Sequence, residues 1–171
     1  MAASRTGWAW VTRGRRRSLL NERQRRSRIP GREEWSGYEA DLDVRYAHRL
    51  FFGKSLDEVQ HHFGGSRSIQ RADELLFMPR RAFQYYVLAF AQFVMSEAAT
   101  GDSDAASTFL GLLLNREKRD PGSVGPVFGD LQPAVEFVAF NQEHFEANPA
   151  IYGVFKERAE QVRDLAKANG A

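Results

Sequence analysis

The chain has 171 residues, 43% of them hydrophobic, which is enough for one domain with a core and too few for two domains. It contains no cysteine, so disulfide scaffolds, thiol nucleophiles and cysteine-ligated metal sites are excluded, and a cytoplasmic location is expected. The net charge of +2 is unevenly distributed, because residues 1–32 hold ten Arg and one acid, whereas residues 33–171 hold 14 Lys or Arg and 21 Asp or Glu. These charges divide the chain into a basic tail, 1–32, and a mildly acidic domain, 33–171.

The basic tail shows neither helical periodicity nor strand alternation, so we predict that residues 1–32 are disordered. Three interpretations are open: an arm that binds nucleic acid by neutralising phosphates, an organelle transit peptide, or an extension without function, such as one created by a start codon placed too far upstream. We favour the last interpretation, because Arg, Gly, Ala and Ser dominate and charge runs are usually solvated. A secretory signal is excluded, since no apolar run of sufficient length follows the charges.

The first part of the domain has two helical patterns. Two apolar stripes at helical spacing predict a helix over residues 38–52 that is buried on two sides, with Gly53 as its left-handed cap. Ser55 followed by Glu58 matches a capping box and predicts a short helix that a Gly-Gly pair at 64 and 65 ends. The following segment, from Ser66 to Leu76, is either a helix or a turn.

The stretch LLFMPRRAFQYYVLAFAQFVMSE, residues 75–97, is the segment around which we expect the rest to be organised. Pro79 fits a helix start, and every residue from Ala82 to Met95 except Gln84 and Gln92 is apolar or aromatic. Because such a helix has no broad polar face, we predict that it lies, over about residues 80–97, buried at the centre of the core. It is too short and too polar for a membrane span.

Three further helices are predicted. Thr100-Gly101-Asp102-Ser103 is a break and supplies the N-cap of a helix over residues 104–119. Asp130 caps a helix to about Ala147, and Asn148-Pro149 caps the last, whose apolar face includes Ile151 and Leu165. The loop DPGSVGPVFG before the second of these is either a connector or a binding edge. The sequence therefore predicts one all-α domain of five to six helices around the central helix.

Few residues are candidates for chemistry. Gly53-Lys54-Ser55 looks like the end of a phosphate-binding loop, but the motif needs glycine where the chain has His48, so we reject nucleotide binding. His48, His61 and His62 would form a metal or acid–base site only if their side chains converged in one pocket. Adjacent His61 and His62 point about 100° apart on a helix and do not readily share one metal. We therefore predict no metal site and no cofactor.

Other polar residues receive structural interpretations. His144 falls on an apolar helix face and is interpreted as a hydrogen-bonded core residue. Arg158 falls inside an apolar arc and could clamp an acidic group, but we favour a surface position with its charged head in water. Asp57-Glu58 and Asp73-Glu74 are interpreted as capping or first-turn charges, since no pair has a spacing that suggests acid–base work. No residue is assigned as catalytic, and the binding residues are unknown.

Two stretches, FFGKSLDEV and ADELLFMPRRAFQYYVLAF, carry a resemblance to a family. Residues 46–97 resemble small uncharacterised bacterial proteins with a Phe-Gly-Lys segment and, after a gap, a helix that starts as Leu-Leu-Phe-Met-Pro-x-x-x-Phe-x-Tyr-Tyr. Val87, Leu88 and Ala89 stand where that pattern has Tyr-Leu-Pro-Ala, so a straighter helix is expected here. The resemblance implies a bacterial cytoplasmic domain and brings no activity, cofactor or site residue.

The functional hypothesis that fits these observations best is a non-enzymatic bacterial module that binds another protein. It would act as an adaptor or as an immunity-type inhibitor whose acidic surface covers a basic partner. One alternative is nucleic-acid binding through the arginine-rich tail, and another is an enzyme with a site near His48, His61 and His62. No membrane partner is expected.

Overall fold

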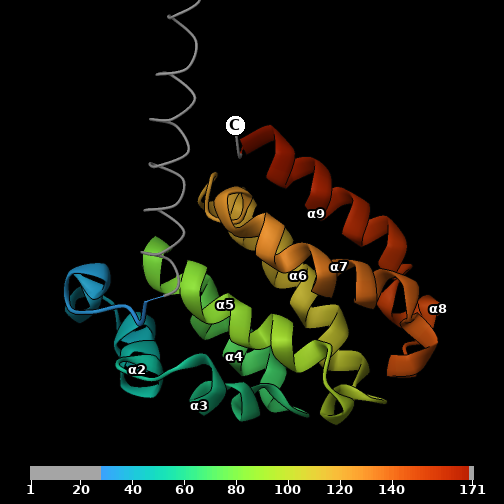
Figure 1. Ribbon diagram of the computed structural model, residues 1–171, viewed down its shortest axis with the longest axis horizontal. Coiled ribbons are helices and arrows are strands. Elements are labelled where there is room, and N and C mark those ends of the chain that lie inside the picture. The colour runs from blue at the N-terminus through green and yellow to red at the C-terminus, as the bar shows by residue number, and fades with distance from the viewer. Residues whose placement is uncertain (1–27, 170–171) are drawn as a thin grey trace, which may run out of the picture.

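Helix α5 (Arg80–Val94) runs through the middle of the fold (Figure 1). The computed structural model describes residues 28–169, so the predicted disorder of residues 1–27 lies outside the described residues. The other α-helices in this range are α2 (Leu42–Phe51), α3 (Leu56–Gln60), α4 (Arg67–Phe77), α6 (Ser103–Arg119), α7 (Phe128–Phe140), α8 (Pro149–Tyr152) and α9 (Phe155–Asn169). Short 3-10 helices lie between them: η1 (Glu33–Trp35), η2 (Tyr38–Ala40), η3 (His61–Phe63), η4 (Glu97–Ala99), η5 (Gly125–Val127) and η6 (Gln142–Phe145). Residues 28–169 contain no strand.

The central position of α5 is confirmed, and aromatic side chains explain it. The Tyr86 ring lies 5.1 Å from that of Phe51 in α2, measured between ring centroids. Phe90, one turn later, stacks on Phe63 of η3 at 4.6 Å and meets Phe109 of α6 edge-on at 5.4 Å. All five rings are fully buried, so α5 joins both halves of the chain in one all-α core.

The ends of α5 differ slightly from the prediction. Pro79 is the residue before the first helical residue, and its ψ of 143° is extended. The helix ends at Val94 instead of residue 97, because Ser96 is extended with ψ of 158° and η4 follows. Met95 therefore lies beyond the helix and is 41% exposed, so the prediction that it is buried is wrong.

The helices are arranged in two layers (Figure 1). Helices α5, α7 and α9 lie side by side, with α4 and α6 behind them, and α2 and α9 occupy opposite edges of the molecule. The described range contains eight α-helices instead of five to six, because α3 and α8 are short segments of five and four residues and the last predicted helix is split. Asn148 caps α8 as predicted, and Gly153, with φ of 72° and ψ of −178°, separates α8 from α9.

Helix α2 is shorter and more exposed than its sequence suggests. Asp41 caps it by accepting hydrogen bonds from the backbone N–H groups of Asp43 and Val44, at 2.8 and 3.3 Å, so residues 38–40 form η2 instead of a first turn. The prediction of a helix buried on two sides is wrong. Only two of its residues, Ala47 and Phe51, are buried, because α2 lies at the edge of the bundle and one face is covered.

Helix α7 also departs from the prediction. It begins at Phe128, so Asp130 lies inside the first turn and is not the capping residue. It ends at Phe140 instead of Ala147, because Asn141 leaves the helical region and η6 follows. Ile151, expected on the apolar face of the last helix, is exposed in α8.

Buried charged side chains hold the loop that follows α6. Arg116 is 4% exposed, and its Nη2 donates a hydrogen bond of 2.9 Å to Oδ2 of Asp120. Glu117, also buried, accepts hydrogen bonds of 2.5 and 2.6 Å from the backbone N–H groups of Gly122 and Val124. These contacts hold the Pro- and Gly-rich loop against the end of α6.

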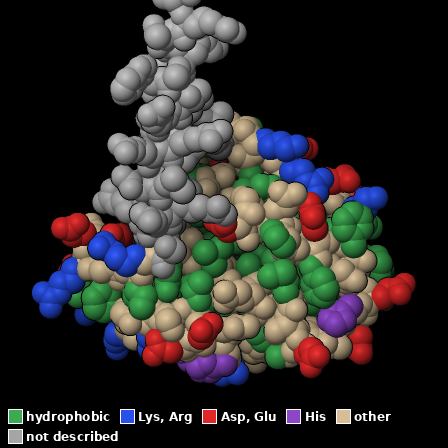
Figure 2. Space-filling view, viewed as in Figure 1, with side chains coloured by type: hydrophobic (Ala, Val, Ile, Leu, Met, Phe, Trp, Pro, Cys, Tyr) green, Lys and Arg blue, Asp and Glu red, His purple; other side chains and the backbone are tan. Residues whose placement is uncertain are grey.

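The surface of the described part is mixed in character. On the face drawn in Figure 2, hydrophobic side chains form a band across the centre and charged side chains lie around the margin. No helix within residues 28–169 combines the length and apolar character needed to cross a bilayer. Packing reaches slightly beyond the predicted domain boundary at residue 33, because Pro30 is buried and the N–H of Gly31 donates to Glu34 at 2.9 Å.

Candidate functional site

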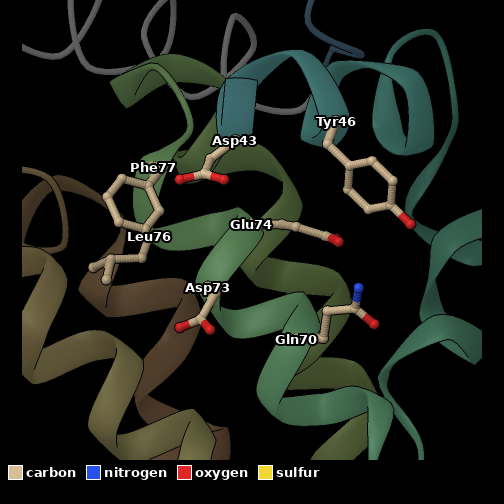
Figure 3. A pocket seen from close by; sticks show the side chains of 7 residues that line it. All are labelled: Asp43, Tyr46, Gln70, Asp73, Glu74, Leu76 and Phe77. Atoms are coloured by element: carbon tan, nitrogen blue, oxygen red, sulfur yellow. The ribbon is translucent and has the colours of Figure 1, made fainter. Parts of the chain in front are cut away.

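A pocket of about 490 Å³ opens between α2 and α4. Its lining residues are Asp43 and Tyr46 from α2 and Gln70, Asp73, Glu74, Leu76 and Phe77 from α4. Figure 3 shows the Glu74 side chain extending from α4 toward the space between Tyr46 and Gln70, with Asp43 and Asp73 on either side of it. The size of the pocket is in the range of small-ligand sites.

Helical periodicity explains why these residues line one pocket. Gln70, Asp73, Glu74 and Phe77 are spaced by three, four and seven residues along α4, which places them on one face of the helix. Asp43 and Tyr46 are three residues apart on α2 and share a face in the same way. Because α2 packs against α4, the two faces meet across the pocket.

Glu74 is the unusual member of this group. Its side chain is only 6% exposed, and Arg71 Nη1 lies 2.8 Å from its Oε2 as an ion pair within α4. That contact lacks hydrogen-bond geometry, so neither carboxylate oxygen of Glu74 has a hydrogen-bond partner among the described residues. Buried carboxylates are normally hydrogen-bonded, so this one has unused acceptor capacity, and its two oxygens lie buried beside the pocket that the residue lines.

The protonation of Glu74 reflects this environment. Burial raises the pKa of Glu74 to about 7, Arg71 opposes the rise, and the neighbouring charge of Asp73 adds to it. Glu74 therefore changes charge near neutral pH. A cation entering the pocket would favour the ionised carboxylate and would supply the missing hydrogen-bond donors.

The chemistry of the lining points to an organic cation. Three carboxylates, an amide and a phenol offer hydrogen-bond acceptors, and two apolar side chains, Leu76 and Phe77, offer contact for an aliphatic stem. Within residues 28–169 no group of three or more His, Cys, Asp or Glu is arranged to hold a metal ion. A guanidinium or ammonium group on a carbon chain fits the acceptors and apolar side chains of this lining.

His48 lies in a second pocket of about 520 Å³, with Tyr38, Glu39, Arg45 and Arg49. Its ring stacks on Tyr38 at 3.8 Å and on Phe52 at 4.4 Å, and burial lowers the pKa of His48. Neither His61 nor His62 lines this pocket. The aromatic contacts account for the position of His48 without a ligand.

His61 and His62 pair with each other. Their ring centroids are 4.1 Å apart, and the pKa of His62 is lowered chiefly by burial and also by the neighbouring His61. His61 and His62 lie in η3, after α3, whereas His48 lies in α2 and lines a pocket that neither of them lines. The three predicted candidates are therefore not brought into one pocket.

His144 and Arg158 have structural partners. His144 Nε2 lies 3.3 Å from Oγ1 of Thr100 and its ring meets that of Phe137 edge-on, so the predicted hydrogen bond is present, but His144 is only partly buried and is not a core residue. The surface position predicted for Arg158 is wrong, because its guanidinium is half-buried and donates to Oγ and O of Ser107 at 2.8 and 3.0 Å. Ser107, a residue of α6, supplies both of these acceptors.

The segment Gly53-Lys54-Ser55 serves as a helix start. Gly53 adopts a φ of 75°, and Ser55 caps α3, since its backbone N–H donates to Glu58 Oε2 at 2.8 Å and its Oγ accepts from the N–H of Glu58 at 3.3 Å. The predicted capping box is thus confirmed. These contacts explain why the segment Gly53-Lys54-Ser55 precedes α3, and they do not require a bound phosphate.

The interpretation of Asp73 and Glu74 as first-turn charges is wrong. Helix α4 begins at Arg67, so both acids lie in its second half. A sequence signal for Glu74 did exist: Arg71 and Glu74 are opposite charges three residues apart, and they interleave with the buried apolar residues Ala72 and Leu75. A charged pair on the apolar arc of a helix indicates a buried ion pair.

Comparison with known proteins assigns neither a family nor a function to the chain. No protein-family model matches the sequence, and searches among curated proteins and among solved structures found no match. The resemblance of residues 46–97 to small bacterial proteins stays a prediction.

Proposed function

We propose that the protein is a non-enzymatic binding module that receives a Lys or Arg side chain of a protein partner in the pocket between α2 and α4. The observation that carries this proposal is Glu74, a buried carboxylate at the pocket whose two oxygens lack hydrogen-bond donors. An arginine fits best, because its planar guanidinium can donate two parallel hydrogen bonds to one carboxylate.

Apolar surface beside the pocket favours a protein partner over a small free amine. Leu42 is 76% exposed and lies one turn before Tyr46, which lines the pocket and is itself exposed. Protein interfaces commonly surround a central anchor with apolar contacts that exclude water. A basic side chain flanked by apolar residues would use both features.

The charge of the described part supports the same partner class. Residues 28–171 hold 16 Lys or Arg against 21 Asp or Glu, a net charge of −5. A negative field of this kind accelerates association with a basic partner and weakens at high salt. This would suit the adaptor or inhibitor roles that the sequence suggests.

The test is the binding of a fluorescein-labelled hexa-arginine peptide to the full chain, followed by fluorescence anisotropy at low salt. Glu74→Gln should weaken binding about tenfold or more, because it removes the carboxylate that meets the guanidinium. Glu97→Gln, the matched control, removes an exposed acid from η4 and should change the affinity less than twofold. Equal effects of the two variants would contradict the proposal, provided that circular dichroism shows both folded.

Nucleic-acid binding through the arginine-rich tail stays the alternative, and it rests on residues outside the described range. The same anisotropy assay with a labelled DNA duplex distinguishes it. Binding through the tail would fall steeply with salt and would not respond to Glu74→Gln. The enzyme alternative has less support, because its three histidines do not share a pocket.

A further inference from the structure

We infer that the chain carries its own occupant for the Glu74 pocket: the segment Arg13–Arg17, RGRRR, which a partner must displace. This inference rests on the proposed function, since it assigns a ligand to the same site. Residues 13–17 contain four arginines in five positions, the densest basic run in the chain. They are the same side chains that the pocket chemistry selects.

Charge complementarity is the first argument. Residues 1–27 hold eight Arg and one acid, a net charge of +7, against −5 for residues 28–171. Covalent linkage keeps these opposite charges together at every protein concentration. The pocket adds a specific target, because Asp43, Asp73 and Glu74 together offer three carboxylates.

The place where the described chain begins is the second argument. Arg28 forms an ion pair with Glu34 at 3.4 Å, and Trp35, in the same η1 helix, is fully buried against His48 of α2, with ring centroids 5.1 Å apart. The chain therefore enters the fold beside α2, which forms one wall of the pocket.

Chain length permits the contact. Arg13 and Arg17 precede Arg28 by 15 and 11 residues, and an extended chain spans at most about 3.3 to 3.6 Å per residue. The arginines can thus reach roughly 36 Å or more from Arg28, well beyond the roughly 22 Å length of the 15-residue helix α5. A short linker within one chain gives an effective concentration on the order of 1 mM.

Competition with the hexa-arginine probe tests the inference in the full chain. The variant R13Q/R15Q/R16Q/R17Q removes a competitor whose effective concentration is about 1 mM. If the arginine segment binds the pocket with an intrinsic dissociation constant of about 100 μM, the variant should bind the probe about tenfold more tightly than the wild type. The gain should disappear when Glu74→Gln is added. The charge-retaining variant R13K/R15K/R16K/R17K should stay within about threefold of the wild type.

The outcomes separate the two proposals. If the probe binds in a Glu74-dependent way but equally tightly with and without the four arginines, this inference is overturned and the proposed function stands. If no variant binds the probe in a Glu74-dependent way, the proposed function fails as well.

A cysteine pair reports the contact directly, because the chain has no native cysteine. Arg16→Cys with Gln70→Cys, at the pocket, should form an intramolecular disulfide on mild oxidation. The control, Arg16→Cys with Glu160→Cys, places the second thiol on α9 at the opposite edge and should react at least about fivefold more slowly (Figure 1). A disulfide-linked dimer as the main product would assign the pocket to a second copy and overturn the inference.

Discussion

Arg116 and Asp120 are joined across the end of α6 by a hydrogen bond of 2.9 Å between Nη2 and Oδ2. Arg116 is almost fully buried, so Asp120 compensates a charge that has little access to water. Asp120→Asn should therefore lower the free energy of unfolding by about 2 kcal/mol at pH 7, the usual range for a charged hydrogen bond. This change in the free energy of unfolding is measured by urea denaturation, with circular dichroism as the signal.

Asp120 also makes the stability of the fold sensitive to acid. The hydrogen bond from Arg80 holds the pKa of Asp120 at about 2, with further help from Ser123 and Arg116. Because the folded pKa lies below the unfolded one, this stabilisation is present above about pH 4 and is lost as the pH falls toward 2. The difference between wild type and Asp120→Asn should shrink between pH 4 and pH 2.5. The exposed Asp164→Asn control should change stability by less than about 0.5 kcal/mol throughout.

Tyr86 links the central helix to the end of α2. Its hydroxyl donates to the backbone O of Phe51, and the O of Lys54 lies within 3.2 Å. Tyr86→Phe keeps the buried ring and leaves these carbonyls without that donor, so the free energy of unfolding should fall by about 1 to 2 kcal/mol. Thermal unfolding measures the change. An unaltered melting temperature would show that the hydroxyl does not stabilise the fold.

Gly153 separates α8 from α9 through its backbone alone. Its φ of 72° with ψ of −178° is a region that essentially only glycine adopts, while an added Cβ would meet no atom within 4 Å. Gly153→Ala should thus cost about 1 to 3 kcal/mol through backbone strain. Gly129→Ala is the matched control, since Gly129 also has space for a Cβ but lies inside α7 without positive φ, and should be neutral or stabilising.

Glu74 predicts a stability that falls toward alkaline pH. Its folded pKa of about 7 exceeds the usual value of 4.5, so the folded state holds the proton more tightly and stability falls as the pH rises from 4.5 to about 7. Glu74→Gln does not titrate. The difference in stability between the variant and the wild type should be constant below about pH 4 and should shift by about 1 to 3 kcal/mol in favour of the variant by pH 8. If the difference in free energy of unfolding between the wild type and Glu74→Gln did not change with pH, Glu74 would not have the raised pKa.

Binding should show the opposite dependence on pH. A guanidinium needs the ionised carboxylate, and ionisation of Glu74 rises from roughly a tenth at pH 6 to roughly nine tenths at pH 8. Affinity of the wild type for hexa-arginine should therefore increase about tenfold over this range. The affinity of the Glu74→Gln variant, measured over the same pH range, is the control. If its affinity also increased about tenfold, Glu74 would be excluded as the cause of the pH dependence.

The central helix was predictable because its pattern is almost independent of context. From Ala82 to Val94 the residues are so consistently apolar that no arrangement leaves one face in water, and α5 lies in the core accordingly. Local capping was predictable for a similar reason. Ser55 with Glu58 and Asp102 with the N–H of Ala105 are contacts between residues three apart, which the sequence displays directly.

Helix boundaries without a strong local signal were not predictable. Nothing next to Ile151 requires a break, and the pattern of residues 149–165 suits one helix, yet Gly153 separates α8 from α9. Helix α2 shows the same limit, because its two apolar stripes would suit a central helix equally well. Its position at the edge decided that only one stripe is covered.

The sequence by itself determined the helical class, the central helix and the separation of a basic tail from an acidic domain, since composition and short-range periodicity carry that information. Only the tertiary structure decided the candidate site. Glu74 belongs to α4, whereas Asp43 and Tyr46 belong to α2, and the pocket exists because these helices pack together. Burial, which is the main cause of the raised pKa of Glu74, depends on how the helices pack around α4.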